Sequence, residues 1–238
     1  MGRGQRHALR GEPGRYLVTK PGQNRPLIIG LTGPIAAGKS QVAAFLAELG
    51  AEVIDADVVY RELISPPSAL LDRIVQRFGA GILDGFGALD RAALGQIVFS
   101  DPAELAALEA ITHPAVIEEV HRRIAASPAD VVVNEAIRLV ESGMANEVDA
   151  LWLVVADPEV RLRRLMARNS LDEESARARL AVSQPTLPDG LSLDEVIDNS
   201  GSLDETRAAV ARAWERLPLR RECSVSTEGT HRERAGKS

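Results

Sequence analysis

The stretch LTGPIAAGKS, residues 31–40, carries Gly33, four further residues and then the tripeptide Gly38-Lys39-Ser40. The apolar run PLIIGLT, residues 26–32, leads into it, and a helical spacing of apolar residues follows it. A glycine-containing loop between a buried strand and a helix turns its N–H groups inward, and the helix N-terminus adds partial positive charge. A chance glycine turn lacks this strand and helix, so we interpret the stretch as a phosphate-binding loop.

This loop predicts ATP and Mg²⁺ as cofactors. Lys39 is expected to contact the β- and γ-phosphates, and the Ser40 hydroxyl is expected to hold Mg²⁺. Pro34 fixes φ and lacks an N–H, and alanines do not reach the conformations of glycine freely, so we expect a stiff loop. The residues predicted to bind the nucleotide here are Gly33, Ala36, Ala37, Gly38, Lys39, Ser40 and Gln41.

The composition excludes several other classes of protein. The 238 residues carry a net charge of −6 and only 3% are aromatic, which argues against a nucleic-acid-binding surface. No apolar run approaches the ~18 residues of a membrane span, and the basic N-terminus lacks the apolar segment of a secretory signal. The single cysteine, Cys223, fits a reducing cytosol. We therefore expect a cytoplasmic protein that binds neither nucleic acid nor membranes.

Strand and helix patterns alternate along the chain, which predicts an α/β fold with a parallel sheet. The fold expected is a five-stranded parallel sheet of the P-loop NTPase type, flanked by helices. Nearly continuous apolar runs are typical of strands buried on both faces. Such runs predict strands in the segments 26–32, 51–57, 130–136, 150–157 and 194–198.

Residues 66–128 are almost entirely helical in pattern, which is long for a crossover and predicts an inserted helical subdomain. Residues 1–26 are interpreted as a mobile basic leader and residues 217–238 as a flexible polar tail. Helix starts are predicted at Asp157-Pro158 and at two capping boxes, Ser170–Glu173 and Ser202–Glu205, the last of which opens a helix over Asp204–Arg216.

Among P-loop proteins, a small-molecule kinase fits the chain best. A GTPase reads guanine with Asn-Lys-x-Asp after a strand, whereas Asn146–Asp149 lacks the lysine and precedes its strand. A motor ATPase would be larger than 238 residues. The size and the inserted helices therefore favour a kinase.

Several separated motifs resemble the dephospho-coenzyme A kinase family, from about Leu27 to Arg216. Besides the loop, they are LGAEVIDADVVYREL (49–63), RFGAGILDGFGALDRAALGQIVFSDP (77–102), LEAITHPAV (108–116), DALWLVVADPEVRLRRLMARN (149–169) and VIDNSGS (196–202). The resemblance implies ATP-dependent phosphorylation of a ribose 3′-hydroxyl, that of dephospho-coenzyme A, in the last step of coenzyme A biosynthesis. It also implies a helical substrate domain at about 61–128, a lid at about 160–190 and a small ribose-containing acceptor. We expect a monomer or small homo-oligomer.

The resemblance further implies roles for single residues. Asp57 maps onto the family's base, which would orient the attacking hydroxyl and take its proton, although Asp55 and Asp57 can instead cap the next helix. Arg161, Arg164 and Arg168 share one helix face. Arg168 maps onto the lid arginine that neutralises the transferred phosphoryl group, and a solvated stripe is the alternative.

Other residues map onto the family's binding sites. His113 maps onto the substrate site, although His113-Pro114 can also mark a helix boundary. Arg61 and Arg91 can hold a substrate phosphate or pair with neighbouring acids. Asn199 maps onto the adenine pocket, and an ordinary turn residue is the alternative.

Residues 134–141, NEAIRLVE, depart from the family pattern at three positions. Glu135 stands in place of Asp, Ile137 in place of Pro, and Arg138 in place of Leu. Because open α/β sheets bind ligands at the carboxyl ends of strands, Glu135 and Arg138 are expected at the acceptor. Arg138 there suits a phosphate or carboxylate, or it points to solvent. The lid segment SQPTLPDGLSLDEV, residues 183–196, is expected to be short or open.

Two other functions stay open. A paralogue could phosphorylate the 3′-hydroxyl of another nucleoside or nucleotide, which would explain Glu135, Ile137 and Arg138. An ATP-binding regulator without catalysis is suggested by Pro34 and Gln41. The retention of Lys39, Ser40, Asp57 and Arg168 speaks against a pure regulator, because a protein that only binds ATP needs no base.

Overall fold

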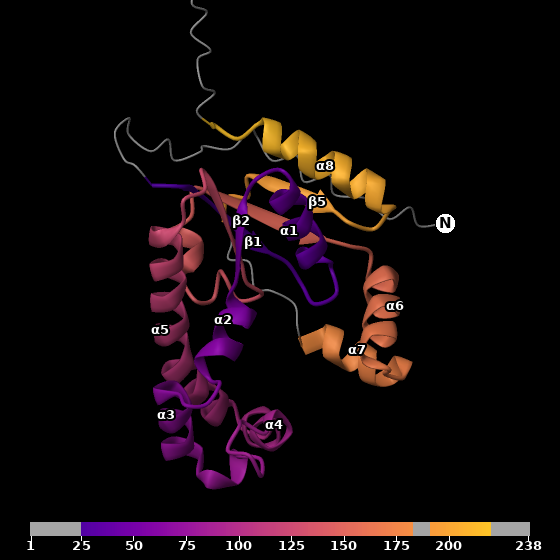
Figure 1. Ribbon diagram of the computed structural model, residues 1–238. Helices are drawn as coiled ribbons and strands as arrows, with labels where there is room; N and C mark the ends of the chain where they lie inside the picture. The colour runs from indigo at the N-terminus through magenta and orange to yellow at the C-terminus, as the bar shows by residue number, and fades with distance from the viewer. Residues whose placement is uncertain (1–24, 183–190, 220–238) are drawn as a thin grey trace, which may run out of the picture.

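The computed structural model describes residues 25–182 and 191–219, with a parallel sheet at its centre (Figure 1). Its five strands follow the spatial order β2-β3-β1-β4-β5, and every neighbouring pair is parallel. This confirms the predicted sheet, and each strand is slightly shorter than its apolar run. The strands are β1 Leu27–Thr32, β2 Glu52–Asp55, β3 Val131–Glu135, β4 Ala150–Val155 and β5 Glu195–Asp198.

The register of the sheet brings the carboxyl ends of three strands together. Leu31 in β1 lies opposite Glu135 in β3, and Glu135 in turn lies opposite Asp55 in β2. The phosphate-binding loop follows β1 directly, so it shares this edge of the sheet with two carboxylates. Open α/β sheets bind their ligands at this edge.

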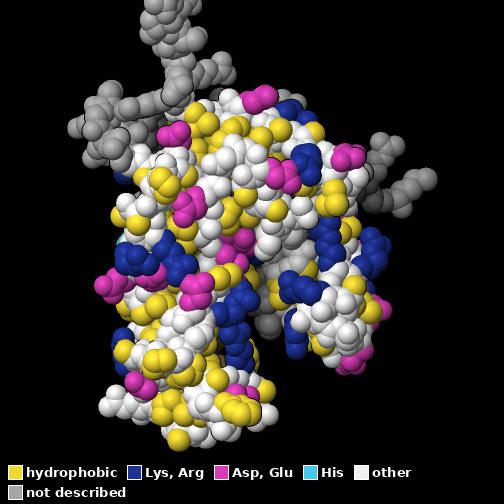
Figure 2. Space-filling view, viewed as in Figure 1, with side chains coloured by type: hydrophobic (Ala, Val, Ile, Leu, Met, Phe, Trp, Pro, Cys, Tyr) yellow, Lys and Arg dark blue, Asp and Glu magenta, His cyan; other side chains and the backbone are white. Residues whose placement is uncertain are grey.

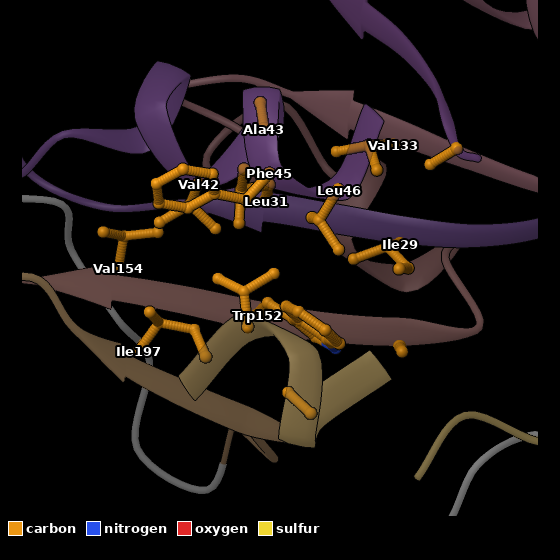
Figure 3. Packing of buried hydrophobic residues seen from close by; sticks show 14 of the residues in the cluster. Ile29, Leu31, Val42, Ala43, Phe45, Leu46, Val133, Trp152, Val154 and Ile197 are labelled. Atoms are coloured by element: carbon orange, nitrogen blue, oxygen red, sulfur yellow. The ribbon is translucent and has the colours of Figure 1, made fainter. Parts of the chain in front are cut away.

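Helices α1 (Lys39–Glu48) and α8 (Leu203–Glu215) cover one face of the sheet. Trp152 of β4 is fully buried there, in one cluster with residues of both helices (Figure 3). Leu217, 6% exposed, belongs to the same cluster, and Leu219 packs against it. A flexible tail beginning at residue 217 is therefore a wrong prediction, because these leucines gain free energy by leaving water. Residues 220–238 lie outside the described residues.

A helical arm is inserted between β2 and β3 and extends away from the sheet (Figure 1). Its helices α2 (Ala56–Leu63) and α5 (Pro102–Ala126) pack on the second face of the sheet. Together with α3 (Ala69–Phe78) and α4 (Arg91–Ser100) they enclose a smaller core of their own. Helix α5 runs through His113 and Pro114, so a helix boundary there is excluded, since tertiary packing outweighs the hydrogen bond that Pro114 removes. The short helix η1, Ala80–Ile82, lies between α3 and α4, and η2, Met144–Asn146, precedes β4.

Helices α6 (Pro158–Asn169) and α7 (Glu173–Val182) stand across from the arm (Figure 1). Ser170 has a φ of 50° and closes α6, whereas Asp172 accepts a bond from the Ser175 N–H at 2.7 Å. The predicted capping box from Ser170 is therefore wrong, because a residue in the left-handed conformation ends a helix. The capping box at Ser202 and the helix start at Pro158 are confirmed. Residues 183–190 of the predicted lid lie outside the described residues.

Defined contacts begin at Arg25, inside the predicted leader, of which residues 1–24 lie outside the described residues. The Arg25 guanidinium donates to both carboxylate oxygens of Asp149, at 2.9 and 2.7 Å. This ion pair fixes the chain just before β1. None of the helices within 25–182 and 191–219 combines the length and hydropathy that a membrane crossing requires.

Candidate nucleotide and acceptor site

The loop after β1 has a backbone that few residues tolerate. Gly33 and Gly38 have φ angles of 154° and 93°. A Cβ atom on Gly33 would also lie 2.3 Å from the Val154 carbonyl oxygen. Ala36 adopts a φ of 60°, although we expected alanine to avoid such conformations. A non-glycine residue in this region stores backbone strain, as ligand-binding loops often do.

Lys39 begins α1 and lies inside this loop. The residue is 8% exposed, and its Nζ donates to the Gly33 carbonyl oxygen at 3.1 Å. Burial lowers the pKa of Lys39, and the negative charges of Glu135, Asp57 and Asp55 oppose that shift. The ammonium group therefore lies within the field of three carboxylates at the position expected for phosphates.

Glu135 lies at the phosphate-binding loop, where it meets Ser40. The Ser40 hydroxyl donates to Glu135 Oε1 at 2.9 Å, and Glu135 is only 6% exposed. Burial raises the pKa of the Glu135 carboxyl, against the hydrogen bond from Ser40. We predicted Glu135 at the acceptor, and the structure instead brings its carboxylate against the Ser40 hydroxyl of the phosphate-binding loop. The sequence did not reveal this contact, because it depends on β3 lying next to β1 in the sheet.

The two acids at the junction of β2 and α2 have different surroundings. The Asp55 carboxylate accepts from the N–H groups of Asp57 and Val58, at 2.8 and 3.2 Å, so Asp55 caps α2 as the structural alternative proposed. Asp57 is not the end of the strand but lies in the first turn of α2. Burial within the cleft raises the pKa of Asp57, and the negative charge of Asp55 raises it further. Lys39, Arg61 and Arg91 partly offset this shift.

Basic side chains line both sides of the cleft between the arm and α6–α7 (Figure 2). On the arm, Arg61 donates from Nε to the Asp57 carbonyl oxygen at 3.0 Å, and Arg91 begins α4. Opposite, Arg164 and Arg168 line a hollow of about 230 Å³. Its other lining residues are Ala36, Gly38, Lys39 and Ser40. The hollow therefore combines the loop with guanidinium groups, as a polyphosphate site requires.

The arginine face of α6 divides into three environments. Arg161 is 5% exposed and donates from Nε to the Ile35 carbonyl oxygen at 3.0 Å. Arg164 donates from Nη2 to the Asn199 carbonyl oxygen at 2.9 Å. Arg168 is exposed at the rim and bonds Asn169 Oδ1 at 3.1 Å. The alternative of a solvated stripe therefore holds only for Arg168. The sequence did not indicate that the three arginines have different surroundings.

The remaining predicted site residues lie at several places. Asn199 is 2% exposed and its Nδ2 donates to the Ala37 carbonyl oxygen at 2.8 Å. The Gln41 N–H donates to the Gly38 carbonyl oxygen at 3.1 Å, within the start of α1. Arg138 follows β3 in a turn and forms an ion pair with Glu109 of α5. His113, half-buried, lies one helical turn from Glu109 on α5, so these two predicted acceptor residues, His113 and Arg138, gather at the same helix.

Comparison with known proteins agrees with this geometry. A sequence model described as dephospho-CoA kinase matches residues 27–205. A dephospho-CoA kinase of Symbiobacterium thermophilum is 47% identical over 192 residues, covering 79% of this chain and 80% of that protein. The crystal structure of TT1252 from Thermus thermophilus is 35% identical, with a TM-score of 0.69 over 81% of this chain and 99% of that one. The dephospho-CoA kinase of Campylobacter jejuni is 26% identical, with a TM-score of 0.54 over 79% and 95% of the two chains. The chain therefore belongs to the dephospho-CoA kinase family.

Proposed function

We propose that this kinase transfers the γ-phosphoryl group of ATP to the ribose 3′-hydroxyl of dephospho-coenzyme A. One observation carries the proposal: Lys39, Ser40, Glu135 and Asp57 converge at the mouth of a strained phosphate-binding loop. A protein that only binds ATP has no need of a carboxylate with a raised pKa beside the phosphate site.

The donor side would hold the polyphosphate through charge and backbone donors. Lys39 would exchange its bond to the Gly33 carbonyl for the β- and γ-phosphates. Arg168, which is exposed and donates from Nε to Asn169 Oδ1, would neutralise charge on the transferred group. Arg164 lines the same hollow and would add a second guanidinium.

The donor set of this site fits Mg²⁺. The Ser40 hydroxyl and the Glu135 carboxylate lie side by side and offer the oxygen ligands that Mg²⁺ prefers. Within the described residues no cluster of three or more His, Cys, Asp or Glu side chains could hold a metal, which agrees with an ion that takes most ligands from phosphates and water. When bound, Mg²⁺ would supply positive charge to the β- and γ-phosphates.

Asp57 would act on the acceptor. Its carboxylate would accept a hydrogen bond from the 3′-hydroxyl and orient the oxygen toward the γ-phosphorus. As the new P–O bond forms, the bond from phosphorus to the bridging β-γ oxygen breaks, ADP leaves and the hydroxyl proton passes to Asp57. The raised pKa of Asp57 favours that late proton transfer.

The helical arm would hold the rest of the acceptor. Dephospho-coenzyme A carries a diphosphate, and Arg61 and Arg91 are exposed on the arm where they could meet it. Both positive charges act on Asp57, so both guanidinium groups lie close to the proposed reaction centre. We therefore propose the arm as the substrate domain and α6–α7 as the described part of the lid.

The three departures from the family pattern do not support a different acceptor by themselves. Glu135 bonds Ser40, Arg138 pairs with Glu109, and the Ile137 carbonyl accepts from the Thr32 hydroxyl at 3.2 Å. Each residue thus has a contact within the fold that does not involve an acceptor.

The test is an assay with Mg²⁺ and ATP, in which dephospho-coenzyme A and a panel of nucleosides and nucleotides compete as acceptors. Products are identified by mass, with Asp57→Asn as the control of strongly reduced activity. We expect one phosphate on dephospho-coenzyme A at ~1–100 per second. Phosphate on another ribose alone would contradict the acceptor, and ATP binding without transfer to any acceptor would favour the regulator.

A further inference from the structure

Two carbonyl groups of the phosphate-binding loop are held from outside by buried side chains. Asn199, after β5, donates from Nδ2 to the Ala37 carbonyl at 2.8 Å. Arg161 of α6 donates from Nε to the Ile35 carbonyl at 3.0 Å. Both side chains are buried, so water competes little for these bonds.

The Asn199 amide has one orientation that satisfies its neighbours. A carbonyl oxygen only accepts, so the amide nitrogen must face Ala37 and the amide oxygen must face Thr206. Thr206 of α8 is fully buried and its hydroxyl donates to Asn199 Oδ1 at 2.9 Å. A chain of hydrogen bonds therefore runs from α8 through Asn199 to the loop.

Because the peptide bond is planar, these two hydrogen bonds also fix the direction of the neighbouring N–H groups. In a trans peptide the carbonyl of one residue and the N–H of the next point in opposite directions. Holding the Ile35 and Ala37 carbonyls outward therefore points the N–H groups of Ala36 and Gly38 the other way. Both residues line the hollow beside Lys39.

The side chain of Asn199 lies in close contact with the backbone of Gly38. A Cβ atom on Gly38 would lie 2.1 Å from Asn199 Nδ2, so the amide packs directly on the loop backbone. Arg164 adds a longer bond from Nη1 to the Ala37 carbonyl, 3.3 Å. Among the described residues, the Ala37 carbonyl thus accepts from side chains of two elements that lie outside the loop.

We propose that Asn199, supported by Thr206, and Arg161 are positioning residues that aim the Ala36 and Gly38 N–H groups at the phosphates. This inference rests on the proposed ATP site and gives Asn199 a role different from reading adenine. A ligand that lacks the adenine ring distinguishes the two roles. Loss of a positioning residue weakens the binding of tripolyphosphate and of ATP alike, whereas loss of an adenine contact weakens the binding of ATP alone.

The first experiment measures the affinity of Mg²⁺–ATP and of Mg²⁺–tripolyphosphate by calorimetry, for the wild type and for Asn199→Leu. Leucine keeps the branched outline without a donor and adds no charge. We expect both ligands to bind about tenfold more weakly, since a buried carbonyl loses its best partner. Weaker ATP binding with unchanged tripolyphosphate binding would overturn the proposal in favour of adenine reading.

A matched pair at Thr206 tests the second link of the chain. Thr206→Val keeps the side-chain shape and removes the hydroxyl, whereas Thr206→Ser keeps the hydroxyl. We expect the valine variant to lose more tripolyphosphate affinity than the serine variant, about threefold more. The control is Thr112→Val, because the buried Thr112 hydroxyl donates to the Leu108 carbonyl of its own helix, at 2.9 Å, away from the loop.

The outcomes separate this inference from the proposed function. If the wild type binds both ligands and Asn199→Leu binds them equally well, the positioning role is wrong while the kinase stands. An equal loss of affinity in Thr112→Val would also overturn the positioning role, because general destabilisation would then explain it. A wild type that binds neither ligand would overturn the ATP site and the inference with it.

Discussion

The two walls of the cleft are built differently. On the nucleotide wall, Lys39, Glu135 and Asn199 are each less than a tenth exposed and each bonds another part of the site. On the arm, Arg61 and Arg91 are exposed. Buried hydrogen-bonded groups have fixed rotamers, whereas exposed arginines lose rotamer freedom only when a ligand orders them. We infer that the nucleotide wall is preorganised and that the arm adapts to its ligand.

The largest effect is expected at the centre of the preorganised wall. Lys39→Met keeps an unbranched side chain, one atom shorter, and removes the charge that we propose for the phosphates. We expect kcat to fall by about 10³-fold, since the ammonium stabilises charge on the transferring group. Initial rates at saturating ATP measure this. A loss of kcat below tenfold would contradict the inference that the nucleotide wall is preorganised for catalysis.

Asp57 stands between the walls and is expected to give the next largest effect. Asp57→Asn should lower kcat by about 10²-fold or more, with ATP affinity retained. The base must be ionised, and its pKa lies above the usual value, so kcat/KM should fall as the pH drops through that raised pKa. A pH–rate profile checks this limb, which should disappear in the variant. A limb that persists in Asp57→Asn would assign it to another group.

Glu135 tests whether the buried acid serves the metal or the acceptor. We expect Glu135→Gln to raise the Mg²⁺ concentration for half-maximal rate by about tenfold, because a neutral amide binds the ion less well. Titration of Mg²⁺ at fixed ATP measures this. The control is Glu109→Gln, on α5, whose carboxylate pairs with Arg138. A raised KM for the acceptor with an unchanged Mg²⁺ requirement would return Glu135 to the acceptor side.

The arm is expected to affect one substrate only. Arg91→Ala should raise the KM for dephospho-coenzyme A by about tenfold and leave the KM for ATP alone, since removing a charged hydrogen bond to phosphate weakens binding. Arg77→Ala is the control, because Arg77 on α3 already pairs with Glu104 at 2.6 Å. An equal rise in both KM values would show that the two walls do not bind separate ligands.

The smallest effect concerns the stability of the arm. Glu119 on α5 accepts hydrogen bonds from Arg122 and Arg123, which lower its pKa to about 2. A carboxyl with a lowered pKa stabilises the fold at pH values above its ordinary pKa of 4.5. It loses that contribution as the pH falls toward 2. Glu119→Gln should therefore cost about 0.5–1 kcal/mol at pH 7, a value limited by solvent screening, and little at the acid end. Urea unfolding at several pH values measures this, and a cost independent of pH would contradict the ion pairs.

Local chemistry predicted much of this molecule. The loop, the five strands and the box at Ser202 depend on neighbours in the sequence, and the structure has each of them. Ser170 and Leu217 were misread because their state depends on distant packing. Ser170 carries a sequence typical of a helix start, yet α6 continues to Asn169 and closes there. Leu217 follows a polar helix end, yet the sheet offers it an apolar surface.

Sequence patterns predict the phosphate-binding loop and the individual strands, because strand burial, glycine conformations and helix starts depend on a few neighbouring residues. The side chains that meet that loop are brought there by folding. Glu135 reaches Ser40 across 95 positions of sequence, and Asn199 reaches Ala37 across 162. Such contacts follow from strand order and register, which a linear pattern does not encode. Hydrogen bonds act over about 3 Å, so the identity of a partner is fixed only when the chain has folded.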